Sequence, residues 1–172
     1  MPQNKNLVDK LASRLSPEGI QLFGAVRSRA ESSALRAFLA GGTVRDLLLD
    51  RESLDVDIVI EGDAVQLARD VAGITGARLA KTTAFGTATL KSGDFSLDLA
   101  TARSETYARP GALPKVTPST IDGDLLRRDF TINAIALQIT TQAPGKLLDP
   151  TGGVSDLRAG LVRVLHDRSF QD

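Results

Sequence analysis

The segment that most constrains the fold is residues 54–60, LDVDIVI, because apolar and polar side chains alternate along most of it. Alternation with a period of two predicts a β-strand that is buried on one face. We expect one face to carry Asp55, Asp57 and Val59. The opposite face carries Leu54, Val56, Ile58 and Ile60.

Two aspartates in one apolar strand require a reason, because aspartate is disfavoured in strands. At positions i and i+2, Asp55 and Asp57 share a face, about 6.6 Å apart along the backbone. Such a pair can converge on one or two cations, and two cations can clamp the reacting oxygens of a phosphoryl transfer. The alternative is a solvated strand face that happens to be acidic.

A second strand is predicted over residues 94–101, where Phe95, Leu97 and Leu99 alternate with Ser96, Asp98 and Ala100. If this strand pairs beside residues 54–60, three carboxylates meet. Clustered carboxylates are costly unless a cation neutralises them, so the pattern favours a metal site. The alternative for Asp98 is a salt bridge to Arg103.

The chain has no cysteine and a single histidine, His166, which excludes a zinc site built from these residues. Carboxylates must therefore hold any metal, which indicates Mg²⁺ or Mn²⁺, although ligand type alone does not separate these ions from calcium. We interpret His166 as non-catalytic. The absence of cysteine fits a reducing cytoplasm.

The charge pattern limits the possible partners. The 21 basic and 21 acidic residues balance, whereas a stand-alone nucleic-acid module is usually basic. Any grip on a large polyanion must then be local or lie outside this chain. There is no apolar run near the ~20 residues of a membrane span, and the N-terminus lacks the apolar core of a secretory signal. We therefore expect a cytoplasmic protein with no membrane partner.

The remaining pattern mixes helices and strands, with a tight hairpin turn at residues 91–94, which favours an α+β fold with a small mixed sheet flanked by helices. Helices are predicted over 7–15, 17–32, 43–49, 63–73, 119–137 (in two pieces) and 155–159. Further strands are predicted over 35–40, 77–81, 85–91 and 161–165, a loop over 103–118 and a turn over 149–153.

Two further segments suit a phosphate ligand. Gly41 and Gly42 precede a predicted helix, so backbone can approach a ligand there, and Arg45 can add a bidentate contact. The alternative is a strand-to-helix turn without a ligand. In residues 125–134, LLRRDFTINA, we expect a helix whose core face is Phe130, Ala134 and Leu137. Its other side would gather Arg128, Asp129 and Asn133, or simply be a charged surface.

The ordered set GGTVRDLLL, LDVDIVI, FGTATL, LDLATARSETYARPGALP and LLRRDFTINAIAL resembles the head domain of bacterial tRNA nucleotidyltransferases and poly(A) polymerases. These form the class II branch of the polymerase-beta-like nucleotidyltransferases. The resemblance runs from about Leu35 to Asp172. It implies template-independent transfer of AMP or CMP from ATP or CTP to an RNA 3′ end, such as that of tRNA, with Mg²⁺ or Mn²⁺.

The resemblance also implies residue roles. Asp55 and Asp57 match the family's metal-binding pair, and Asp98 matches its third carboxylate. The nucleotide would contact Gly41, Gly42 and Arg45 through its triphosphate. Arg128 matches a nucleotide-contacting arginine, and Arg103 is expected to help with phosphate.

The resemblance implies a domain plan as well. Residues 1–34 would form a helical extension packing on the head, and residues 35–172 would form the catalytic head. The family's neck, body and tail, which select the base and grip RNA, have no counterpart here. We therefore expect this chain to be part of a longer enzyme.

Two other readings share some of these features. A glycosyltransferase that uses Mn²⁺ and a nucleotide sugar would share the paired aspartates but does not predict RRDFTINA or Asp98. A regulatory nucleotide-binding module with an idle site would not need three intact carboxylates.

Overall fold

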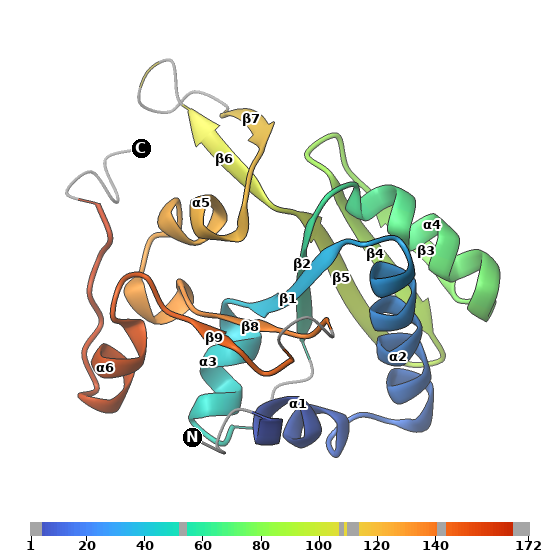
Figure 1. Cartoon of the computed structure of the whole chain (residues 1–172), viewed down its shortest axis with the longest axis horizontal. Helices are drawn as coiled ribbons and strands as arrows, with labels where there is room; N and C mark the ends of the chain where they lie inside the picture. Colours follow the sequence, from blue (N-terminus) through green and yellow to red (C-terminus); the bar gives the residue numbers. More distant parts are fainter. Residues whose placement is uncertain (1–4, 52–54, 107–108, 110–113, 141–143, 167–172) are drawn as a thin grey trace.

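The computed structural model describes residues 5–51, 55–106, 109, 114–140 and 144–166. Over these residues the chain forms a seven-stranded mixed sheet, ordered β3-β4-β5-β2-β1-β8-β9, and a separate β6–β7 pair. The strands are β1 (Arg36–Ala40), β2 (Val56–Glu61), β3 (Arg78–Thr82), β4 (Thr87–Ser92), β5 (Phe95–Thr101), β6 (Arg103–Thr106), β7 (Lys115–Pro118), β8 (Ala136–Gln138) and β9 (Leu147–Leu148). The helices are α1 (Lys5–Ala12), α2 (Pro17–Ser32), α3 (Gly42–Leu48), α4 (Ala64–Thr75), α5 (Ile121–Leu126), the 3₁₀ turn η1 (Thr131–Asn133) and α6 (Gly153–Arg158). The predicted α+β class is confirmed, with helices around a mixed sheet (Figure 1).

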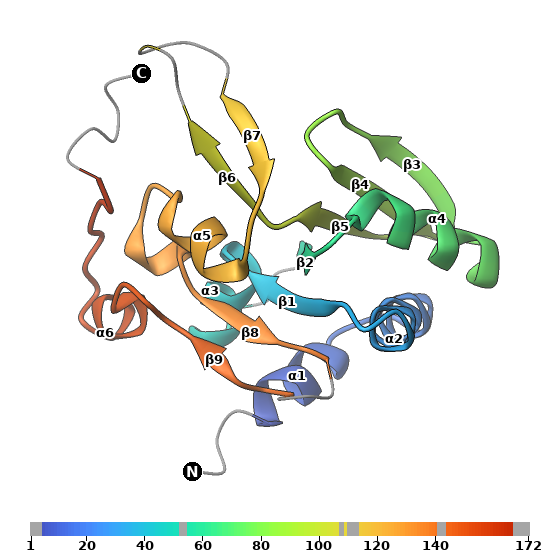
Figure 2. The same cartoon turned by 45° about the horizontal axis from the view of Figure 1, so that its top comes forward.

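Strand β2 lies inside the sheet, antiparallel to β1 and parallel to β5. Its alternation sorts its residues as predicted. One core contains Val56, Ile58 and Ile60 together with side chains of α1, α2 and α4, whereas Val59 belongs to a second core with Ile121 and Leu125 of α5. The helices thus cover different faces of the sheet, and the acidic side of β2 is the face of the α5 core (Figures 1 and 2). Leu54 lies outside the described residues.

Helix α2 begins where the sequence indicates. The Ser16 side chain accepts a hydrogen bond from the Gly19 amide and Pro17 occupies the first turn, which is a favourable N-terminal cap. Its apolar side chains, Leu22, Phe23 and Val26, are buried in the same core as β2. Because this burial anchors α2, the N-terminal helices are part of the packed structure around the sheet.

The predicted loop over residues 103–118 is wrong at both ends. Strands β6 and β7 pair there antiparallel, with Arg103 opposite Pro118 and Thr106 opposite Lys115. Proline is tolerated because each strand of a two-stranded ladder is an edge strand. The pair extends away from the large sheet (Figure 2).

The predicted helix over residues 119–137 is also wrong in its second half. Helix α5 ends at Leu126, and the chain then forms η1 and strand β8, which pairs with β1. Ala134 and Leu137 consequently lie in different cores instead of on one helical face. The short apolar run 134–139 fits a buried strand as well as a helix, and its pattern alone cannot separate the two.

The remaining differences are small. The strand predicted over 161–165 is only a single bridge between Phe130 and Val164. Strand β9 was not predicted. No helix in the described part of the chain is long and apolar enough to cross a membrane.

Candidate active site

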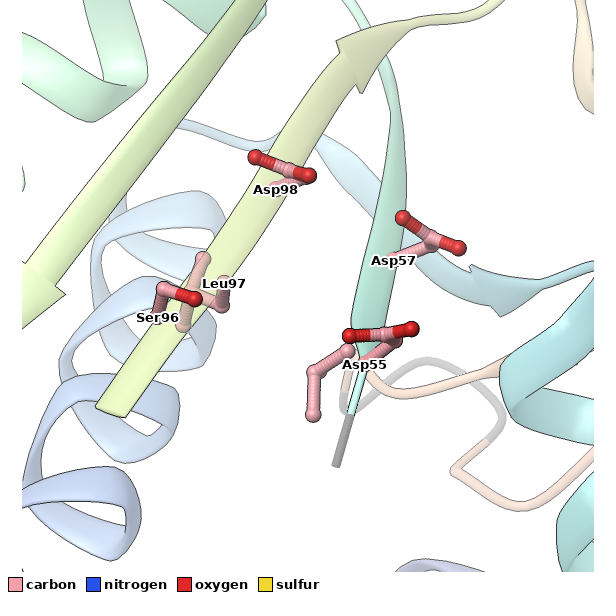
Figure 3. Close-up of a pocket in the computed structure, with 6 residues that line it drawn as sticks. Asp55, Asp57, Ser96, Leu97 and Asp98 are labelled. Atoms are coloured by element: carbon pink, nitrogen blue, oxygen red, sulfur yellow. The ribbon is translucent and has the colours of Figure 1, made fainter. Parts of the chain in front are cut away.

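The acidic residues meet where β2 and β5 run side by side. In this parallel ladder Asp57 is the direct partner of Asp98, and Val56 is the partner of Leu97. Asp55 lies just before β2, two residues from Asp57. The condition attached to the sequence prediction is therefore met: the two acidic strands are neighbours, and the three labelled aspartates lie along them in Figure 3.

These aspartates line a hollow of about 240 Å³ in the surface. Its lining is Asp55, Val56, Asp57, Ser96, Leu97 and Asp98. All three carboxylates are exposed to solvent. Among the described residues none of them forms an ion pair with a lysine or arginine, so their charges are not neutralised by direct contact.

The environment of the acidic group changes the pKa of Asp57. Partial desolvation by the surrounding protein raises the pKa of its carboxyl, and the negative charges of Asp98 and Asp55 raise that pKa further. The positive charge of Arg128 acts in the opposite direction and lowers the pKa of Asp57. A bound cation would relieve the repulsion that the three carboxylates impose on one another.

The donor set fits a hard divalent cation, because Mg²⁺ and Mn²⁺ prefer carboxylate oxygens. As the side chains stand, no three acidic or histidine groups within the described ranges are close enough together to hold one ion. Side-chain rotation of Asp55, Asp57 and Asp98 is thus required before all three could share a metal.

The glycine turn lies beside the acidic strand. Gly41 has φ of +66°, which disfavours any residue with a Cβ, and a Cβ there would lie only 2.6 Å from Nη1 of Arg128. Gly42 begins α3. The turn therefore allows the Arg128 guanidinium to lie directly against the backbone.

The Arg45 guanidinium is engaged by two side chains, those of Asn133 and Asp46. Its Nη1 donates to Oδ1 of Asn133 at 2.8 Å, and its Nε donates to Oδ1 of Asp46 at 2.9 Å. The bond to Asn133 connects α3 to η1, whereas the bond to Asp46 stays within α3. Arg45 thus cross-links the GGTVRD and RRDFTINA segments, which are distant in sequence.

Arg128 is held by a carboxylate that the sequence did not single out. Its Nη2 donates to Oδ2 of Asp124 at 2.9 Å, while its Nε is buried without a hydrogen-bond partner within the described residues. Asp124 is 1% exposed and also binds Arg127 at 2.8 Å. Asp124 precedes these arginines by three and four residues, so helical spacing could have indicated the pairing, whereas its burial and its contact with the Arg103 amide depend on the tertiary fold.

Arg103 lies at the start of β6 and does not pair with Asp98. Its Nε donates to Oε1 of Glu105 at 2.9 Å, and its guanidinium lies 5.9 Å from the centre of the Phe85 ring. The salt bridge considered as an alternative for Asp98 is therefore absent from the structure. Asp98 instead accepts a hydrogen bond from the Thr89 hydroxyl.

Thr43, within the GGTVRD segment, is a further residue of the site that no sequence pattern singled out. Its hydroxyl is buried between α3 and β2, where it contacts the backbone of both Asp55 and Asp57. The motif alone shows no sign of this contact, since it depends on how the turn packs against the strand. His166 lies elsewhere, with Nε2 hydrogen-bonded to the Leu126 carbonyl.

Three carboxylates on paired strands, bordered by a glycine turn and arginines, define a candidate nucleotidyl-transfer site on a mixed-sheet head. Residues 37–163 match the family described as the poly A polymerase head domain. The chain belongs to this family. The glycosyltransferase reading is thereby set aside.

Proteins similar to this chain in sequence and in structure include tRNA nucleotidyltransferases. The A-adding tRNA nucleotidyltransferase of Aquifex aeolicus is 51% identical over 136 residues, covering 79% of this chain and 16% of that enzyme. The A-adding enzyme of Halalkalibacterium halodurans is 42% identical over 168 residues, covering 97% of this chain and 39% of that enzyme. A tRNA nucleotidyltransferase complexed with a primer tRNA and an incoming ATP analog superposes with a TM-score of 0.73 at 42% identity, over 85% of this chain and 40% of that one. The chain thus spans less than half the length of these relatives.

Proposed function

We propose that this protein transfers a nucleotide, AMP or CMP, from ATP or CTP to the 3′ end of an RNA, with tRNA as the favoured acceptor. The observation that carries the proposal is the pairing of Asp57 with Asp98 across β2 and β5, with Asp55 two residues away. These three acids have no cationic partner among the described side chains, and in a nucleotidyltransferase head such a group suits a metal-bound triphosphate.

The proposed metal ligands are Asp55, Asp57 and Asp98, and the proposed ion is Mg²⁺ or Mn²⁺. When bound, the metal would neutralise charge on the reacting phosphate and lower the pKa of the attacking hydroxyl. The fit rests on the donor chemistry and on the raised pKa of Asp57, which is caused first by partial desolvation and then by the negative charges of Asp98 and Asp55, whose repulsion a cation would relieve.

In the reaction, an RNA 3′-hydroxyl oxygen forms a bond to the α-phosphorus of the nucleoside triphosphate. The bond from the α-phosphorus to its bridging oxygen breaks, pyrophosphate leaves, and the hydroxyl proton passes to solvent. Asp55, Asp57 and Asp98 contribute by fixing the position of the triphosphate rather than by covalent chemistry.

We assign the triphosphate and nucleotide contacts to Gly41, Gly42, Arg45 and Arg128, with Arg103 as a further phosphate contact. The Arg128 charge already reaches the acidic group, because it lowers the pKa of Asp57. Arg45 would have to exchange its bond to Asn133 for a phosphate, and Arg103 would do the same with Glu105. Guanidinium groups suit this exchange because they bind carboxylates and phosphates with the same geometry.

The favoured substrates are ATP and a tRNA that lacks its terminal adenosine, because the relatives from Aquifex aeolicus and Halalkalibacterium halodurans are named A-adding enzymes. We further propose that residues 35–172 are the catalytic head, that residues 1–34 form an extension packed on it, and that the activity is cytoplasmic. The apolar side chains that α1 and α2 share with β2 in one core support the packing of this extension on the head.

The test is transfer of labelled AMP or CMP to tRNA transcripts that end in CC or lack the whole CCA end, with Mg²⁺ present. Asp57→Asn should reduce transfer at least about 100-fold, because metal clamping stabilises the transition state by several kcal/mol. Asp94→Asn, an exposed aspartate in the β4–β5 turn, should keep wild-type activity. Undiminished transfer by Asp57→Asn, or ATP binding that is indifferent to Mg²⁺ with no transfer, would overturn the proposal; the second result would favour a regulatory module.

A further inference from the structure

The Thr43 hydroxyl makes two hydrogen bonds to the backbone of the acidic segment. Its Oγ1 donates to the Asp55 carbonyl oxygen at 2.9 Å and accepts from the Asp57 amide at 3.0 Å. A hydroxyl can donate and accept at the same time, so one side chain satisfies both groups. Thr43 itself is only 3% exposed, so the hydroxyl end of this bridge is shielded from solvent.

The bridge lies where the sheet stops supporting β2. Strand β1 pairs with β2 only as far as Leu39 opposite Ile58, and the chain then turns at Gly41 into α3. Beyond Ile58, β1 supplies no ladder partner for the edge of β2 that faces it. The Thr43 hydroxyl occupies the place of that missing partner, because it bonds both backbone groups that β1 leaves unpaired.

This contact holds the backbone that carries the acids. Asp57 has support from β5 on its other side through the pairing with Asp98, whereas Asp55 precedes the strand. Without the hydroxyl, the Asp55 carbonyl and the Asp57 amide would lose a partly buried partner, and the segment from Asp55 to Asp57 could rotate away from an extended form. The spacing of the two carboxylates would then no longer be fixed.

We propose that Thr43 is a positioning residue of the metal site, which sets the relative placement of the Asp55 and Asp57 carboxylates through their backbone. The inference rests on the proposed function, because it assumes that these carboxylates bind a divalent cation. Groups that orient metal ligands without touching the metal typically change metal affinity by about 10- to 100-fold when they are removed.

The test compares Thr43→Val, which keeps the shape but loses the hydroxyl, with Thr43→Ser, which keeps the hydroxyl. Mn²⁺ binding is measured by electron paramagnetic resonance on the intact protein without RNA, and kcat and KM for ATP are measured with tRNA. Thr43→Val should bind Mn²⁺ at least about 10-fold more weakly. Its kcat should fall at fixed Mg²⁺ more than its KM rises, and Thr43→Ser should restore both.

Thr140→Val is the matched control, since Thr140 is a buried threonine whose hydroxyl bonds lie away from the acids. It should bind Mn²⁺ like wild type whatever its melting temperature. Thr43→Cys, with a side chain of similar size and a much weaker hydrogen bond, is measured in parallel so that the result does not depend on the folding of the valine variant.

The outcomes are distinguishable. If folded Thr43→Val or Thr43→Cys binds Mn²⁺ and turns over like wild type, the role of Thr43 is refuted and the proposed function stands. If the wild type binds no more Mn²⁺ than Asp57→Asn, the proposed metal site itself fails.

Discussion

Asp57 and Asp98 are direct partners across the parallel β2–β5 ladder, so two negative charges face each other on neighbouring strands. A folded protein normally avoids like charges in directly opposed positions, because they repel each other. Here Asp55 adds a third negative charge on the same segment. Repulsion among these carboxylates therefore destabilises the metal-free fold, and its relief when a cation binds adds to the binding free energy.

The first prediction concerns Asp57→Asn in metal-free buffer. The pKa of Asp57 is raised in the folded protein, so ionising this carboxyl costs stability above its ordinary pKa of 3.8. The variant should melt slightly above wild type at pH 7 in EDTA. The gain should stay below about 1 kcal/mol, because solvent reaches the exposed side chain and screens it.

The sign of this effect should change with conditions. As pH falls through the raised pKa the folded carboxyl is protonated first, and below 3.8 the unfolded one is protonated as well, so the advantage of Asp57→Asn should shrink over this range and vanish below it. In saturating Mg²⁺ the wild type should become the more stable protein, because the ion binds only its folded form. Thermal melts across pH, with Asp94→Asn as the unaffected control, check both points; a variant less stable than wild type in EDTA at pH 7 would contradict the charge-repulsion account.

The second prediction concerns Gly153, the first residue of α6. A Cβ there would lie 2.1 Å from the carbonyl oxygen of Thr131, so backbone would have to move. Gly153→Ala should destabilise the protein by about 3 kcal/mol, at the upper end of typical overpacking costs. Urea unfolding followed by circular dichroism measures the change.

Gly73 provides the matched control because it lies within α4, where a Cβ added to it would meet no atom within 4 Å among the described residues. Gly73→Ala should stabilise the protein by roughly 0.5–1 kcal/mol, as expected for a helix interior. Equal unfolding midpoints for the two alanine variants would show that the contact between α6 and η1 is looser than described.

The third prediction concerns Asp124. Its carboxylate accepts from Arg127 and Arg128 and from the Arg103 amide while being 1% exposed. Asp124→Ala would leave two arginines without this partner, so we expect a loss of about 3 kcal/mol in the free energy of unfolding. The loss is measured by urea titration.

Asp122→Ala is the control on the same helix: it tests whether removing any aspartate of α5 lowers the free energy of unfolding. Asp122 is exposed in the first turn, where its interaction with the helix dipole contributes no more than about 1 kcal/mol. Similar destabilisation by the two substitutions would mean that Asp124 acts on helix α5 and not on the arginines.

Much of the site could be predicted because strands that are buried on one face impose a period of two. The alternation at Val56, Asp57 and Ile58 correctly separated the core face from the acidic face. The neighbourhood of β2 and β5 could be stated only as a condition, since strand order depends on contacts distant in sequence. The roles of the site residues stay predictions.

Other parts were beyond sequence reasoning for physical reasons. The run 134–139 is buried as a strand beside β1, and its apolar pattern also fits a helix. The Thr43 bridge arises only after a turn packs against a strand, so no local pattern announces it. Asp124 is a mixed case: Arg127 and Arg128 lie three and four residues away, so their pairing is local, but the burial of Asp124 and its contact with the Arg103 amide depend on the tertiary fold.

The parallel pairing of β2 with β5 also affects how the protein folds. Helix α4 and strands β3 and β4 all lie between the two acidic strands in sequence, so Asp57 and Asp98 become neighbours only after a large chain segment has closed. Contacts of such high sequence separation form slowly, because closing the loop loses conformational entropy before the favourable contact is made. A divalent ion bound across these strands would therefore bind only chains in which β2 and β5 have already paired. Partially folded chains that lack this pairing would not bind the ion.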